Sequence, residues 1–343
     1  AAEVKNVQNN VGLAEVNGFN RFEIIGTDRH KFLDRLCCGT VTKRDGRVGL
    51  GYLLNEHGMV KAEATFANIP ASDRGGARTW YGSAAAAEYH DMDWLVTHMD
   101  PSEDVQIRSL TNDQTILVLA GPNARKVLSS CARGDWSKEA FKWLDVREAF
   151  IGYAPATVMA VSFSGELAYE IHVPNASLYN AYLALRDAGT AFDMKLFGAR
   201  AVESMRMEKG FLHWKADIIT EFDPYETGLD RFVKLDKGDF VGRDALLKRR
   251  ETEPAKKLVS LQIDSTTAPA HGGASLMDGN RVVGTITSGD WGHRVGSNLA
   301  YAFVDAGFVA IGTKMMLNMC GDMVAATVIP TAPYDPDFSN LRQ

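Results

Sequence analysis

The pattern of apolar and polar residues changes at the charged run of residues 252–257, and this change constrains the fold more than any other feature. Before the run, strand-like stretches alternate with helix-like stretches, which is typical of a mixed α/β region. After it, short strand-like segments are separated by glycine turns, which is the pattern of a small barrel. These segments are residues 257–263, 281–287, 299–304 and 323–328. We therefore predict an α+β chain with a domain boundary between residues 1–252 and residues 253–343.

The composition of the chain excludes several classes of protein. Its 343 residues, 45% of them hydrophobic, can bury a large core and exceed one typical domain. The net charge of -6 argues against a nucleic-acid partner, because such a partner requires a basic face. No window reaches the roughly 18 uninterrupted apolar residues of a membrane span. The four cysteines lack metal-ligand spacing. We therefore predict a soluble chain without a metal site.

Residues 162–171 carry two carboxylates, a glycine and two aromatic side chains within an otherwise apolar strand pattern. The apolar residues on both sides of Glu170 predict that its side chain is drawn toward the interior, where an unpaired carboxylate is costly. A buried carboxylate between aromatic walls suits a flat, nitrogen-rich ligand with paired N–H donors, such as a pterin. The alternative is a glutamate that closes a hairpin or pairs with an arginine.

Two further segments accompany this one, residues 54–65 (LNEHGMVKAEAT) and residues 203–210 (ESMRMEKG). In this order and at these separations, the three segments resemble the folate-binding family of the glycine-cleavage T-protein (aminomethyltransferase). Within that family they are most similar to the tetrahydrofolate domain at the C-terminal end of dimethylglycine and sarcosine dehydrogenases. The resemblance runs from about Val11 to the C-terminus. It implies a two-lobed α/β region with an inner lobe at about residues 50–140, a C-terminal barrel, and a folate channel where these units meet.

The resemblance also implies roles for individual residues. Glu63 falls where the family places an acidic side chain, usually Asp, that positions the reactive amine or iminium against the folate nitrogen. The alternative is a strand glutamate that faces water. Phe163 falls where a tyrosine is usual, so an aromatic wall remains and a hydroxyl donor is missing. Glu170 falls on the glutamate that grips the pterin. The adjacent Tyr169 is counted with the folate site, although strand alternation turns it to the opposite face.

Three more residues are candidates for folate contacts. Phe19 matches a position that often carries an apolar residue against the folate, and an ordinary core phenylalanine is the alternative. Arg206 is a candidate to neutralise a folate carboxylate, but a structural ion pair with an interior acid is the preferred interpretation. Arg294 lies in the loop of residues 287–296 and is a candidate for the folate tail, with a solvated loop arginine as the alternative.

The function implied by the resemblance is methylene transfer from an N-methylated amine such as dimethylglycine or sarcosine to tetrahydrofolate, by the folate domain of a demethylating dehydrogenase. Two alternatives stay open. Glu63 and Phe163 depart from the amine-handling pattern, which leaves room for a folate-dependent S- or O-demethylase. The other alternative is a non-catalytic folate-binding assembly or regulatory protein.

The surroundings of such a domain can also be predicted. The glycine cluster of residues 46–51 lacks the G-x-G-x-x-G spacing, so we expect no flavin site in this chain. The expected partners are folate, a small methylated substrate, and a flavin dehydrogenase domain or subunit. Because the chain begins with Ala1, we expect a piece of a longer protein. Its expected location is the cytoplasm, or the mitochondrial matrix in a eukaryote.

Overall fold

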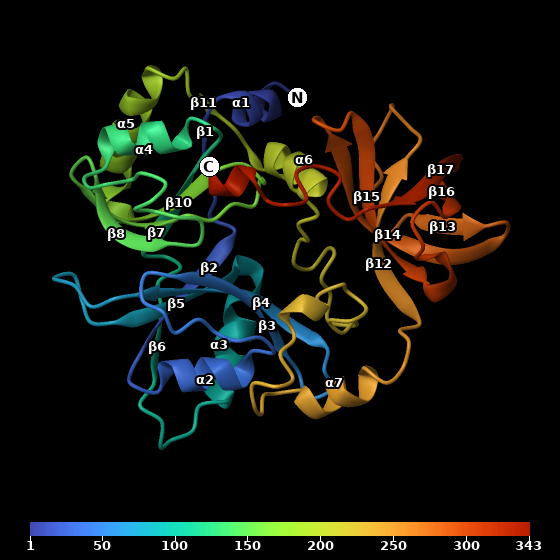
Figure 1. Cartoon of the computed structure of the whole chain (residues 1–343), viewed down its shortest axis with the longest axis horizontal. Helices are drawn as coiled ribbons and strands as arrows, with labels where there is room; N and C mark the ends of the chain where they lie inside the picture. Colours follow the sequence, from blue (N-terminus) through green and yellow to red (C-terminus); the bar gives the residue numbers. More distant parts are fainter.

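Two facing β-sheets and a barrel form the chain, and the computed structural model describes all of residues 1–343 (Figure 1). The first sheet has five strands in the order β3-β4-β5-β2-β6. Its strands are β2 (Phe19–Ile25), β3 (Val48–Leu54), β4 (Val60–Ile69), β5 (Arg78–Ala84) and β6 (Gln106–Ser109). Helices α2 (Arg29–Leu36) and α3 (Glu88–Thr97) cover its outer face. Phe32, Leu33 and Leu36 of α2 form the apolar stripe that packs on these strands.

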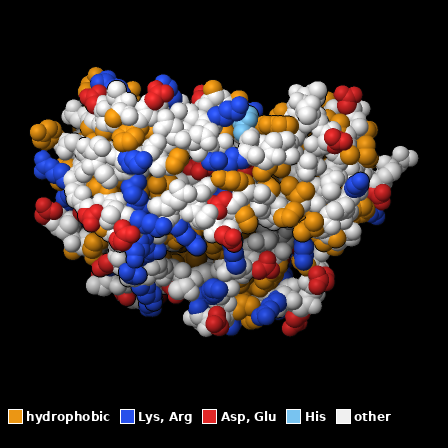
Figure 2. Space-filling model, turned by 45° about the horizontal axis from the view of Figure 1, so that its top comes forward, with side chains coloured by type: hydrophobic (Ala, Val, Ile, Leu, Met, Phe, Trp, Pro, Cys, Tyr) orange, Lys and Arg blue, Asp and Glu red, His pale blue; other side chains and the backbone are white.

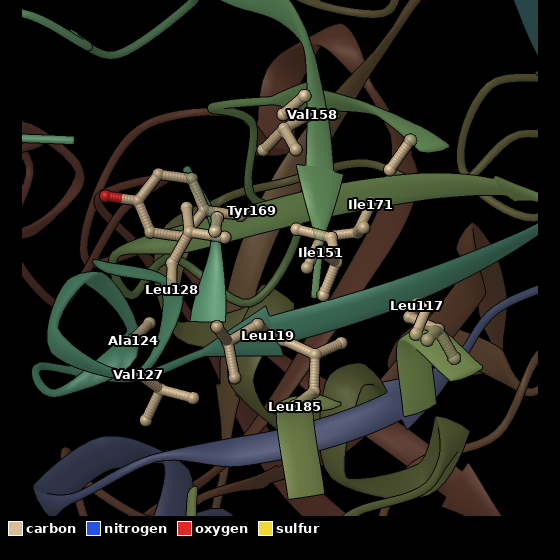
Figure 3. Packing of buried hydrophobic residues seen from close by; sticks show 14 of the residues in the cluster. Leu117, Leu119, Ala124, Val127, Leu128, Ile151, Val158, Tyr169, Ile171 and Leu185 are labelled. Atoms are coloured by element: carbon tan, nitrogen blue, oxygen red, sulfur yellow. The ribbon is translucent and has the colours of Figure 1, made fainter. Parts of the chain in front are cut away.

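The second sheet has six strands in the order β11-β1-β7-β10-β9-β8. Its strands are β1 (Gly12–Glu15), β7 (Gln114–Ala120), β8 (Val146–Ile151), β9 (Ala154–Met159), β10 (Ala168–Pro174) and β11 (Lys195–Leu196). Helices α4 (Ala124–Cys131) and α5 (Leu178–Thr190) cover its outer face, and α1 (Ala2–Asn9) lies beside β1. The spacing of Ala124, Val127 and Leu128 places these side chains on the sheet-facing stripe of α4 (Figure 3).

The inner faces of the two sheets pack on one another through a small hydrophobic cluster. Side chains alternate between the faces of a strand. Ala67 of β4 and Trp80 of β5 therefore point inward, while their neighbours Phe66 and Tyr81 point toward the helices. Met159 of β9 meets the inward side chains from the second sheet. This cluster joins the two sheets. The side chains that share its face on each strand therefore also point between the sheets.

The third part is a closed six-stranded barrel in the order β12-β15-β14-β13-β16-β17. Its strands are β12 (Lys256–Ile263), β13 (Ser275–Asp278), β14 (Arg281–Gly292), β15 (Ser297–Asp305), β16 (Lys314–Met319) and β17 (Asp322–Ile329). Helix α6 (Ala199–Lys209) packs on β14 and lies between the barrel and the second sheet (Figure 1). Residues 210–242 then lead to α7 (Arg243–Arg249). The three parts therefore meet around α6 and the segment that follows it.

The predicted α+β fold with a C-terminal barrel is confirmed. The inner lobe, however, differs from its expected limits of about 50–140, because its sheet spans residues 19–109. Strand β2 pairs with both β5 and β6, whereas β7 joins the second sheet. No helix in the chain is both long and apolar enough to span a bilayer. On the face shown in Figure 2, Lys and Arg side chains gather in a band on the left, with acidic side chains among them.

Candidate functional site

Glu170 lies on the inner face of β10, at the edge of the cluster that joins the two sheets. Its side chain is 24% exposed, and its Oε2 lies 3.3 Å from Nε2 of His172, its hydrogen-bond partner. His172 packs on Trp80 of the first sheet, with ring centroids 5.6 Å apart. Burial lowers the pKa of the Arg21 guanidinium, and the nearby charge of Glu170 opposes this effect. Glu170 therefore points between the sheets, toward β2 and β5.

The opposite wall, on the first sheet, carries small side chains and one carboxylate. Gly82 of β5 pairs with Thr65 of β4, and Glu63 is the next residue on the inner face of β4. Leu50 of β3 pairs with Thr65 and is 43% exposed, although its inner-face neighbours on β3 are buried. The inner face is therefore accessible at these positions. Glu63 and Glu170 thus lie on the inner faces of the two facing sheets, and we call the region between these faces the inter-sheet site.

The protonation of Glu63 is set by its surroundings. Burial raises the pKa of its carboxyl to about 7, a hydrogen bond from Tyr52 opposes this rise, and the charge of Asp217 adds to it. The Tyr52 hydroxyl donates to Glu63 Oε1 across β3 and β4, with 2.8 Å between the oxygens. The pKa of Tyr52 is raised well above its ordinary value, first by burial and then by Glu63. The phenol therefore stays protonated while the carboxyl exchanges its proton near neutral pH.

Aromatic side chains from the loop after β9, the segment after α6 and the C-terminal tail stack on one another. Phe163 follows β9 and stacks on Phe211, with centroids 6.2 Å apart and the planes 8° from parallel. Phe338 of the C-terminal tail continues the stack at 5.9 Å from Phe211. His213 lies 6.4 Å from Phe163, tilted by 43°. The structure thus places Phe163 in an ordered aromatic wall, next to a histidine that the sequence analysis did not single out.

Asp217 fixes the segment that carries this wall, and Arg206 fixes Asp217. Arg206 is completely buried, and its Nη1 donates to Asp217 Oδ2 at 2.8 Å and to the Phe211 carbonyl at 2.8 Å. Its Nε donates to Glu203 at 2.9 Å. Asp217 Oδ2 also accepts the backbone N–H of His213. All of these partners of Arg206 are protein groups, so the structure does not bring this residue to the inter-sheet site as a ligand for a carboxylate.

Arg294 joins the barrel to the second sheet. Its guanidinium donates to Glu166 Oε1 at 2.8 and 3.1 Å and to the Gln8 carbonyl at 2.7 Å. It lies over the ring of Tyr334, 4.7 Å from the centroid. These contacts tie the barrel loop to the loop before β10 and to the C-terminal tail. They do not connect Arg294 with Glu63 or Glu170.

The last two predicted residues lie on opposite faces of their sheets. Phe19 is half-buried on the inner face of β2, on the same side as Arg21 and opposite Ala84 of β5. Tyr169 is completely buried on the outer face of β10, among side chains from the helix-covered core (Figure 3). The Arg125 guanidinium lies over its ring at 5.7 Å. The structure therefore places Phe19 toward the inter-sheet site and Tyr169 away from it, because successive strand residues face opposite ways.

Tyr52, Phe211 and Asp217 were missed by the sequence analysis as parts of the site. A signal for Phe211 was its position two residues after the end of α6, in a segment rich in aromatic residues. A signal for Tyr52 was its position two residues before the segment of residues 54–65, which carries Glu63. No three His, Cys, Asp or Glu side chains gather in a cluster that could hold a metal ion.

The raised pKa of Glu63 predicts a specific dependence of stability on pH. In the folded chain the carboxyl loses its proton at about 7 rather than at its ordinary 4.5, so the folded state holds one more proton between these values. The stabilising contribution of the protonated Glu63 carboxyl is complete below pH 4.5 and is lost as pH rises through about 7. We therefore expect the free energy of unfolding of Glu63→Gln, relative to that of the wild type, to rise by about 1–3 kcal/mol from about pH 5 to about pH 8. Denaturant unfolding of both proteins at the two pH values measures this, and an unchanged difference would contradict it.

Comparison with known families identifies the class to which this architecture belongs. A sequence model of the GCVT N-terminal domain matches residues 1–237, and one of the glycine cleavage T-protein C-terminal barrel domain matches residues 256–335. The second match covers the closed barrel. The chain therefore belongs to the glycine cleavage T-protein family, as the resemblance of its three segments predicted.

Relatives of the chain include both transferases and dehydrogenases. It is 29% identical to the mitochondrial dimethylglycine dehydrogenase of Rattus norvegicus over 346 residues, which cover 100% of this chain and 40% of that protein. It is 28% identical to the mitochondrial sarcosine dehydrogenase of Mus musculus, covering 94% of this chain and 37% of that protein. The aminomethyltransferase of Caldanaerobacter subterraneus is 25% identical, with 98% of this chain and 88% of that protein covered. The chain thus spans about two-fifths of the length of the dehydrogenases that it matches.

A solved structure supports the fold. The glycine cleavage system aminomethyltransferase T from Bartonella henselae superposes with a TM-score of 0.86 at 21% identity. The match covers 98% of this chain and 89% of that protein. The arrangement of two sheets and a barrel is therefore the T-protein fold.

Proposed function

We propose that this chain transfers a methylene group from an N-methylated amine, such as dimethylglycine or sarcosine, to tetrahydrofolate. The observation that supports the proposal is that Glu63 and Glu170 lie on the inner faces of the two facing sheets, with partly exposed side chains. The two carboxylates have different surroundings: Glu63 is held by a phenol and Glu170 by an imidazole. Different surroundings suit different roles, one in binding and one in proton transfer.

Glu170 and its surroundings fit the pterin of tetrahydrofolate. Glu170 Oε1 accepts no hydrogen bond from the protein, while Oε2 has only His172 as its partner. A partly exposed carboxylate with free acceptor capacity suits the paired N–H donors of a pterin edge. Gly82 and Thr65 on the opposite wall are small, which leaves room for a flat ring. Phe163 supplies an apolar face beside this region.

Glu63 fits the chemistry of the transfer. When bound, tetrahydrofolate supplies the nitrogen nucleophile that takes up the methylene carbon. As a carboxylate, Glu63 stabilises the positive charge of an iminium donor and takes up a proton during the transfer. Its pKa of about 7 lets it gain and lose a proton in the physiological range. Because Glu63 Oε1 is held by Tyr52, Oε2 is the oxygen that faces the donor.

The source of the methylene group follows from the lengths of the relatives. Dimethylglycine and sarcosine dehydrogenases are more than twice as long as the segment that they share with this chain. We propose that a flavin dehydrogenase part, joined to this chain or separate from it, oxidises the methylated amine. It delivers the carbon to the inter-sheet site as an iminium or as formaldehyde.

The proposal is tested by following methylenetetrahydrofolate formation from tetrahydrofolate, formaldehyde and sarcosine, with and without the chain. We expect the chain to raise the initial rate well above that of the uncatalysed condensation, because it orients the donor and accepts the proton. An unchanged rate would contradict methylene transfer. In that case, methyl transfer from a sulfonium or an aromatic ether to tetrahydrofolate, measured with the same protein, would favour the S- or O-demethylase alternative.

A further inference from the structure

Tyr52 and Glu63 form a pair that is fixed by the backbone as well as by their side chains. The two residues are directly opposite one another in the antiparallel ladder of β3 and β4. The Tyr52 side chain is buried, and the ring of Phe232 meets it edge-on at 5.0 Å and 65°. A buried aromatic ring with a packed neighbour has little rotamer freedom. The phenol oxygen therefore has one position, 2.8 Å from Glu63 Oε1.

The hydrogen bond of this pair has a fixed direction. The Tyr52 pKa lies well above its ordinary value, so the phenol remains a donor and Glu63 the acceptor at every pH at which proteins function. Glu63 Oε2 accepts no hydrogen bond from any protein group, whereas Oε1 accepts one. The pair thus presents one free carboxylate oxygen in a defined orientation.

Few other charged groups act on the pair. Asp217, from the segment after α6, acts on Glu63, and it is completely buried against Arg206. Arg231, next to Phe232, and the buried thiol of Cys38 act on Tyr52 in opposite directions. Asp217 disfavours the carboxylate form of Glu63, whereas the Tyr52 hydrogen bond favours it. Tyr52 is therefore the group in contact with Glu63 that favours ionisation.

We propose that Tyr52 is the positioning residue of the inter-sheet site, holding Glu63 Oε1 so that Oε2 faces the transferred carbon as a carboxylate. This inference rests on the role proposed for Glu63. It adds that the phenol sets both the orientation of the carboxylate and the pH range in which it is ionised. A phenyl ring in place of the phenol would retain the packing and lose both effects.

The test is Tyr52→Phe, with Tyr81→Phe as a matched control. Tyr81 is a buried phenol of the same sheet that donates to Asp91 at 2.9 Å, but it lies on the outer face. Carbon-13 NMR of labelled glutamate carboxyls in the folate-free protein reports the Glu63 pKa, and Glu63→Gln assigns the signal. We expect Tyr52→Phe to raise this pKa by about one pH unit, as loss of a hydrogen bond to a charge does. Tyr81→Phe should leave it unchanged.

The same variants are compared in the transfer assay. We expect the rising limb of the pH profile to move upward with the Glu63 pKa in Tyr52→Phe, giving about a fivefold lower rate near pH 7 and recovery at higher pH. Tetrahydrofolate affinity should stay unchanged. If Tyr52→Phe is too unstable to study, 3-fluorotyrosine at position 52, a stronger donor, should lower the Glu63 pKa instead.

The outcomes separate this inference from the proposed function. An unchanged Glu63 titration in the folate-free variant would overturn the role of Tyr52, whatever the activity. A rate that falls by the same factor at every pH, as a purely structural defect would cause, would also overturn it. A shifted titration in a protein that shows no transfer would instead contradict the proposed function and leave the pair intact.

Discussion

Glu63→Gln is expected to slow methylene transfer by about 10²–10³-fold while tetrahydrofolate affinity stays within about twofold of the wild type. The amide keeps the shape of the side chain and can still accept the Tyr52 hydrogen bond. It cannot stabilise a cationic donor or take up a proton. An interaction that matters only as charge develops lowers the rate and not the affinity.

The measurement is the initial rate of methylenetetrahydrofolate formation, with the affinity determined separately. Glu56→Gln is a suitable control, because Glu56 is an exposed glutamate in the turn that leads into β4. It removes the same charge a few residues away and should transfer at the wild-type rate. If Glu63→Gln transferred the methylene group at the wild-type rate, Glu63 would have no catalytic role. The chain would then be a folate-binding protein that does not carry out this reaction through Glu63.

Much of the fold was predictable because the signals that define its elements are local. Strand alternation and turn residues act over a few positions, so four of the six barrel strands were predicted, three of them to within two residues of their observed limits. Strand β14 runs five residues further than predicted, and the short strands β13 and β16 were not predicted. The family and the α+β class were confirmed as well. The pairing of β2 with β5 joins segments about 60 residues apart. Such pairing leaves no local pattern, which is why the limits of the inner lobe differ from expectation.

The Tyr52–Glu63 pair shows how a single backbone irregularity decides a contact. If the register at the hairpin turn continued along the strands, Gly51 would stand opposite Glu63. An irregularity between Leu53 and Leu54 shifts the register by one residue, so Tyr52 takes that place. A one-residue shift turns every following side chain to the other face. The phenol contact therefore could not be read from the hairpin pattern alone.

Long-range pairing of charges was the other part that the sequence did not resolve. Arg206 had two interpretations, a folate ligand and a structural ion pair with an interior acid, and the structure has the second. The partner, Asp217, lies 11 residues further along the chain and is completely buried. Burial of both charges requires that they pair, but spacing alone does not say which acid is chosen. For Glu170 the expected inward orientation agrees with the structure. Its role in binding folate stays a prediction.

Glu170→Ala is expected to weaken tetrahydrofolate binding by about 1.5–3 kcal/mol, which is roughly 10- to 150-fold in Kd. The variant removes the carboxylate proposed to accept hydrogen bonds from the pterin edge. His172 is the hydrogen-bond partner of this side chain, and the charge of Glu170 also acts on the buried Arg21. Glu15→Ala is the control, since Glu15 is an exposed glutamate in β1 of the same sheet.

Isothermal titration calorimetry of tetrahydrofolate into these three proteins tests the central claim most directly. The account predicts one site per chain in the wild type, the same affinity in Glu15→Ala, and an affinity at least tenfold lower in Glu170→Ala. No binding heat in the wild type, or wild-type affinity in Glu170→Ala, would contradict the assignment of the inter-sheet site to folate.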